Sequence, residues 1–131
     1  MAMTRIYSII TLAIILISTN VIYAQVKSNE GVFKFEKEWY DFGKIDKEVK
    51  VSYDFKFTNV GLSPLIISDV DAGCSCTVPE WPKTPILPNT SATIKVSYSS
   101  KDHNGIFNKA IRISSNSSTP TKIIRIKGFV K

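Results

Sequence analysis

Side chains that bind metals or carry catalytic chemistry are scarce in this chain. It contains one histidine, His103, and two cysteines, Cys74 and Cys76, and both methionines, Met1 and Met3, lie at the extreme N-terminus. A zinc site normally takes four ligands, and copper(I) held by two thiolates would have no methionine beside them. We therefore predict no metal site and no bound cofactor, and Cys74, Cys76 and His103 are the only candidates for one.

Catalytic motifs are missing as well. The chain has only 11 acidic residues, and no spacing among them suggests the paired carboxylates of a hydrolase. The sequence contains neither a glycine-rich phosphate loop nor a serine-centred elbow. A nucleophilic pair of cysteine and histidine would lack a third group to orient it. We predict that the protein is not an enzyme.

The positive charge is not concentrated in one stretch. The net charge is +6, and the lysines are scattered along the chain without a basic run interleaved with aromatics. Such scatter is typical of a solvated surface, and attraction to anionic polymers or lipid head groups is the alternative. We expect no nucleic-acid partner.

The N-terminal segment has the layout of an export signal. Arg5 precedes an apolar run over residues 6–17, and the small Ala24 offers a cleavage point. The run is about a dozen residues long, short of the ~20 that cross a bilayer as a helix. We predict a signal-peptide helix over residues 1–24 and an extracytoplasmic protein, either periplasmic or secreted. The alternative is an uncleaved segment, which would be the only contact with a membrane.

The rest of the chain alternates with a period of two. Residues 25–31 form a polar leader, and residues 32–131 are the size of one domain. The clearest strand covers residues 49–58, where five apolar residues alternate with five polar ones. Further strands are expected at 32–37, 39–45, 65–70, 92–99, 107–113 and 123–130. About seven to eight strands, separated by frequent turns, predict an all-β sandwich of immunoglobulin-like type, with a barrel as the alternative.

A proline-rich stretch interrupts this pattern. Prolines recur every third residue from 79 to 88, and each lacks the N–H that a central strand needs. We interpret residues 73–82, which hold both cysteines and Trp81, as the start of a stiff crossover between the sheets. Trp81 would anchor this crossover.

The sequence is compatible with several roles for Cys74 and Cys76. In an extended segment their side chains point the same way, so they could form a disulfide, act as a redox pair or bind a soft metal. They could also pack as small apolar groups beside Trp81. Trp39 and Trp81 are interpreted as anchors at the edge of the core, with a carbohydrate-binding platform as the alternative.

Several segments resemble the bacterial family named domain of unknown function 1573. The similarity covers about residues 40–130 and includes the motif at 73–82, where the family usually has Cys-Gly-Cys-Thr and this chain has Ser75 in the middle. Residues 40–43 and 58–61 are also similar to the sperm-protein and cilium-associated immunoglobulin-like domains. The resemblance implies an immunoglobulin-like sandwich in an extracytoplasmic bacterial location, and it implies no established activity.

Together these features favour an exported, non-enzymatic module. It would bind a protein or another partner at the cell envelope, or have a structural role there. The alternatives are thiol redox chemistry or soft-metal binding through Cys74 and Cys76, and carbohydrate binding through Trp39 or Trp81.

Overall fold

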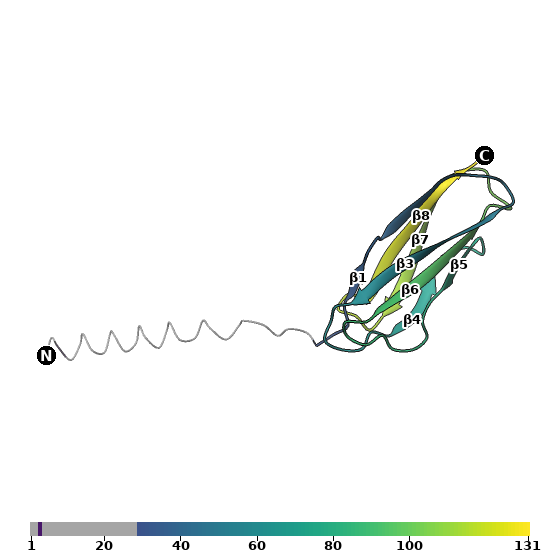
Figure 1. The fold of residues 1–131 in the computed structure, drawn as a ribbon. Helices are drawn as coiled ribbons and strands as arrows, with labels where there is room; N and C mark the ends of the chain where they lie inside the picture. Colours follow the sequence, from purple (N-terminus) through teal and green to yellow (C-terminus); the bar gives the residue numbers. More distant parts are fainter. Residues whose placement is uncertain (1–2, 4–28) are drawn as a thin grey trace.

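The computed structural model describes residue 3 and residues 29–131, and the second range forms a sandwich of two four-stranded sheets (Figure 1). One sheet has the strand order β1-β3-β6-β5 and the other β2-β8-β7-β4. The strands are β1 Phe33–Phe35, β2 Trp39–Ile45, β3 Lys50–Asn59, β4 Ile67–Asp71, β5 Thr77–Glu80, β6 Ser91–Ser99, β7 Gly105–Ser115 and β8 Thr121–Val130. The predicted all-β sandwich is confirmed.

The N-terminal predictions fall largely outside this description. Apart from residue 3, the predicted signal peptide and the first part of the leader, residues 25–28, lie outside the described residues. Within the described part of the chain, no helix has the length and apolar character needed to cross a membrane.

The ladders are antiparallel with one exception. β3 pairs with both β1 and β6, and β7 pairs with both β4 and β8, in antiparallel register. β2 instead lies parallel to β8, and their register shifts between Asp41 and Lys44. Gly43 sits in this shift with a positive φ of 66°, a conformation that suits glycine.

The core lies between the inner faces of the two sheets. Phe55 and Phe57 of β3 are buried there, as their alternation predicts. Aromatic rings stack across the interface, with 4.0 Å between the ring centroids of Tyr98 and Phe107. Burying each large apolar side chain stabilises the fold by roughly 1.5–3 kcal/mol. Further buried residues are Ile94, Val96, Ile111, Ile113, Ile124, Ile126 and Val130.

The crossover prediction is confirmed in outline and wrong in one detail. The segment that carries both cysteines leaves β4 in one sheet and enters β5 in the other. Thr77–Glu80, expected as part of the stiff crossover and not as a strand, pairs with β6 as a strand. Because β5 lies at the edge of its sheet, one side of its backbone needs no partner, and Pro79 is tolerated there.

One end of the sandwich is held together by Asn59, the last residue of β3. Its side chain is fully buried and makes four hydrogen bonds to the backbone. The Oδ1 atom accepts from the N–H groups of Val32 and Gly61, and the Nδ2 atom donates to the carbonyls of Ser63 and Ile86. A single side chain thus joins three separate segments of the chain.

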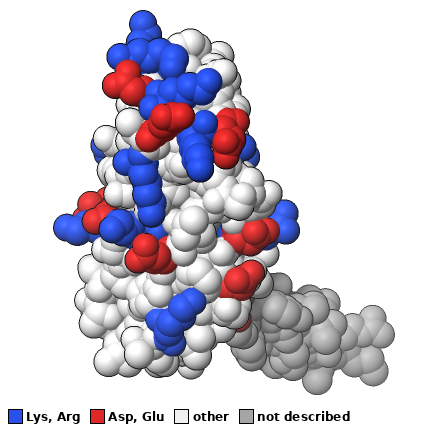
Figure 2. Space-filling model, turned by 90° about the vertical axis from the view of Figure 1, so that its right-hand side faces the viewer, with Lys and Arg blue, Asp and Glu red and all other residues white. Residues whose placement is uncertain are grey.

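On the face drawn in Figure 2, the two ends of the sandwich differ in how many charged side chains they carry. Figure 2 shows that, on the face drawn, charged side chains of both signs crowd the upper end, where the chain terminates in Figure 1. The lower end of this face is mostly uncharged.

Candidate functional site

The outer face of the sheet β2-β8-β7 exposes large apolar side chains among cations. Trp39 is 59% exposed, Phe129 41% and Ile106 80%. The strand register places Ile106 opposite Phe129, and Phe129 opposite Lys44. We use "outer face" for the exposed outward side chains of these three strands: Trp39, Asp41, Lys44, Ile106, Asn108, Ala110, Arg112, Thr121, Ile123, Arg125, Lys127 and Phe129.

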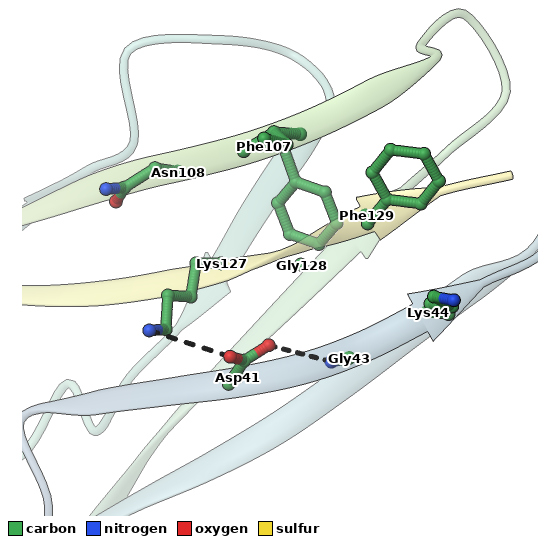
Figure 3. Close-up of a pocket in the computed structure, with 9 residues that line it drawn as sticks. Asp41, Gly43, Lys44, Phe107, Asn108, Lys127, Gly128 and Phe129 are labelled. Carbon is green, nitrogen blue, oxygen red and sulfur yellow. Dashed lines mark hydrogen bonds and ion pairs between the residues drawn. The ribbon is translucent and has the colours of Figure 1, made fainter.

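A hollow of about 350 Å³ opens where the β2–β8 ladder is interrupted (Figure 3). The carboxylate of Asp41 accepts a hydrogen bond from the N–H of Gly43 at 2.8 Å, which holds the bulge. Gly128 faces the ring of Phe107, and a Cβ atom added to it would lie 2.6 Å from that ring. Gly43 and Gly128, which have no side chains, both line the hollow.

The polar contacts on this face are those of a solvated surface. Lys127 Nζ lies 3.6 Å from Asp41 Oδ2 and 4.9 Å from the centroid of the Trp39 ring. Exposed pairs of this kind stabilise a fold by at most about 1 kcal/mol. The outer face carries the cations Lys44, Arg112, Arg125 and Lys127 against the single carboxylate of Asp41, so its own charge is positive.

The two tryptophans have different environments. Trp81 packs against the core, and Lys83 Nζ lies 3.0 Å from the centroid of its ring. Trp81 is therefore an anchor, as expected. The same interpretation is wrong for Trp39, because Tyr40 and Phe42 of the same strand take the side that packs against the core.

The cysteines form the second notable site. Cys74 and Cys76 are joined by a disulfide with an S–S distance of 2.07 Å. The Oγ1 atom of Thr77 lies 3.7 Å from the sulfur of Cys74 and 3.6 Å from that of Cys76. Thr77 itself is buried, whereas both cysteines are half-buried and Ser75 is exposed. Cys76 also packs against the core.

A hollow of about 250 Å³ borders this disulfide. His103 of the β6–β7 loop, the third candidate from the sequence, lines this hollow together with the two cysteines. His103 Nε2 lies 3.1 Å from the carbonyl oxygen of Ile106 and donates to it. The other residues that line the hollow are Ser75, Ser99, Lys101 and Asp102. In the described part of the chain, no three His, Cys, Asp or Glu side chains are grouped to hold a metal ion.

Sequence reasoning missed the apolar part of the outer face. Ile123 and Phe129 occupy positions of β8 whose neighbours on the same side are the charged Arg125 and Lys127. Apolar residues on the polar side of an alternating strand were the available signal. No pattern in the sequence indicates that Thr77 lies close to the disulfide, because the turn in the folded chain brings its hydroxyl near both sulfurs.

The strand arrangement defines an immunoglobulin-like sandwich domain. The chain belongs to the family described as protein of unknown function (DUF1573), whose model matches residues 33–130. This confirms the resemblance found in the sequence. A search of the curated proteins found no match.

Three solved structures illustrate how widely the fold occurs. A protein of unknown function from Porphyromonas gingivalis W83 has a TM-score of 0.68 and 19% identity, covering 83% of this chain and 51% of its own. The VesB protease of Vibrio cholerae has a TM-score of 0.60 and 14% identity, covering 78% and 32%. The ASH/PapD-like domain 7 of human CEP192 has a TM-score of 0.60 and 9% identity, covering 86% and 94%.

These likenesses concern the fold alone. The chain spans about half of the Porphyromonas protein and a third of the protease, which are therefore longer than the shared domain. The likeness to the human domain extends over nearly the whole of both chains.

Proposed function

We propose that this domain is an exported, non-enzymatic binding module of the bacterial cell envelope, and that it docks a protein partner on the outer face of β2-β8-β7. The observation that carries the proposal is the exposure of Trp39, Ile106 and Phe129 on one positively charged face. Single exposed apolar residues are ordinary, whereas several on one face mark an interaction surface.

The chemistry of the outer face suggests the character of the partner. The hollow beside Phe129 has room for an apolar side chain, and the cations Lys44 and Lys127 line it. Arg125 lies further along β8, opposite Trp39. A partner segment with carboxylates around an apolar anchor would complement both features. We therefore favour an acidic protein segment as the partner.

Site-specific crosslinking in the bacterial host would test this docking. A photo-crosslinking amino acid in place of Phe129 is expected to capture a discrete protein, whereas one in place of Lys56, on the outward side of the other sheet, is not. Lys127→Glu combined with Arg125→Glu should abolish the Phe129 product. Lys50→Glu combined with Lys56→Glu makes the same charge change on the other sheet and should leave the product intact.

Two results would contradict the proposal. Equal products from Phe129 and Lys56 would mean that the outer face is not selective. A product formed with glycan rather than protein would favour the carbohydrate alternative, which the exposure of Trp39 supports.

Fractionation of the same cells would test export, since a protein retained in the cytoplasm would have no envelope partner.

A further inference from the structure

We propose that the Cys74–Cys76 disulfide is a thiol–disulfide exchange site whose substrate is the dithiol of another extracytoplasmic protein. This inference goes beyond the binding role, and it rests on the crossover rather than on the outer face. Three features support the proposal. The disulfide borders an open hollow, groups nearby can stabilise a leaving thiolate, and the fold does not depend on the bond.

The disulfide borders an open hollow on one side. Both cysteines line the hollow of about 250 Å³, and the exposed Ser75 between them leaves the turn open to solvent. An attacking thiolate must approach a sulfur directly. A fully buried disulfide would prevent this approach, and the half-buried Cys74 and Cys76 do not.

The surroundings favour the departure of a thiolate. The buried hydroxyl of Thr77 lies within 3.7 Å of both sulfurs, so it can donate a hydrogen bond to whichever one becomes charged. Lys101 and His103 line the same hollow, and Asp102 is the single carboxylate among its lining residues. Cations and hydrogen-bond donors lower the pKa of a thiol and make it a better leaving group.

The bond contributes little to holding the fold together. Only one residue separates the two cysteines, so the disulfide closes a very short loop and restricts the unfolded chain much less than a long one would. Backbone hydrogen bonds fix the same turn, from the N–H of Thr77 to the carbonyl of Cys74 and from the N–H of Ser99 to that of Cys76. The turn should therefore survive reduction.

The exchange balances as two displacements. A thiolate of the partner dithiol attacks one of the two sulfurs, the Cys74–Cys76 bond breaks, and the other cysteine leaves as a thiolate. The second thiolate of the partner then attacks the mixed disulfide and releases the remaining cysteine. The partner is oxidised to a disulfide, and Cys74 and Cys76 gain two electrons and the two protons that the partner gives up.

Reduction kinetics of the oxidised mature chain would test the site. With dithiothreitol as the probe, we expect release of two thiols per chain while circular dichroism shows an intact fold. Thr77→Val removes the donor with little change of shape, and it should slow this reaction about ten-fold. Thr93→Val makes the same change on β6 and should leave the rate unchanged. Lys101→Gln provides a second test that does not alter the buried turn, and it should also slow the reaction.

A trapping experiment would test the substrate. In the bacterial host, Cys76→Ser and Cys74→Ser variants each keep one thiol, which can attack the disulfide of the oxidised partner and release one partner thiol. These variants are expected to accumulate the resulting mixed disulfide with a protein. The exchange proposal fails if thiols appear only when the domain unfolds, or if Thr77→Val and Lys101→Gln both react at the wild-type rate. An adduct with glutathione alone would overturn the assignment of a protein dithiol.

Discussion

Asn59 shows how much of this fold can depend on one residue. Its four hydrogen bonds satisfy backbone groups of Val32 just before β1, of the β3–β4 loop and of the segment before β6. Because the site is buried, water cannot replace these bonds when the side chain is removed.

Asn59→Ala is expected to lower the free energy of unfolding by about 3 kcal/mol or more, since unsatisfied buried groups cost about 1–3 kcal/mol each. Urea denaturation would measure the change. Asn116→Ala is the matched control, because Asn116 also bonds two backbone groups, at Ile66 and Pro64, but is exposed. It should cost less than about 1 kcal/mol, and equal losses for the two variants would contradict this reasoning.

Tyr98 is a second residue whose burial has a measurable consequence. Desolvation raises the pKa of its phenol above 10.0, and its hydroxyl has no hydrogen-bond partner among the described residues. Between pH 10 and the raised pKa, the unfolded chain therefore releases this proton while the folded chain keeps it. The contribution of Tyr98 to stability is fully present below pH 10 and is lost as pH rises through the raised pKa.

We expect Tyr98→Phe to be as stable as the wild type at pH 7, or more so, and to lose less stability between pH 9 and about pH 11. Urea midpoints at these pH values would show the difference. A variant that is markedly less stable at pH 7, or that has an unchanged pH dependence, would show that the hydroxyl is satisfied in the folded protein.

At the scale of elements, the bulge in β2 depends on backbone conformation. A Cβ atom at Gly43 would meet nothing within 4 Å, so a substitution there changes only the cost of a positive φ. Gly43→Ala should destabilise the domain by about 1 kcal/mol and lower Tm by about 4–8 °C. Gly43→Asn should lower it less, because asparagine tolerates this conformation. Equal melting temperatures for both variants would contradict the argument.

Strands with strict alternation could be predicted from the sequence, because a half-buried strand imposes that pattern directly. β3 is the clearest example. β5 was missed because a proline such as Pro79 excludes a central strand but not an edge strand. Whether a strand lies at the edge of its sheet depends on the whole fold and not on the local sequence. Trp39 was misassigned for a related reason, since which side of β2 is buried depends on the partner sheet. The hollow beside the disulfide joins two loops that pairing alone brings together.

On the scale of the whole molecule, the two proposed sites belong to different parts of the sandwich. The docking surface lies on the outer face of one sheet, whereas the disulfide lies where the chain passes between the sheets. Charge reversal on the outer face should therefore leave the rate of disulfide reduction unchanged. The same experiments can thus separate failure of one proposal from failure of the other.

The parallel pairing of β2 with β8 has a mechanical consequence. The described chain enters the sandwich at one end and Lys131 lies at the other (Figure 1), so tension between them pulls β2 and β8 in opposite directions along their length. All the hydrogen bonds of that ladder then bear the load together. Pulling through Asn104 and Lys131 would instead open the antiparallel β7–β8 ladder one pair at a time. Single-molecule force spectroscopy should record a higher unfolding force in the first geometry, giving a domain that resists stretching from its termini.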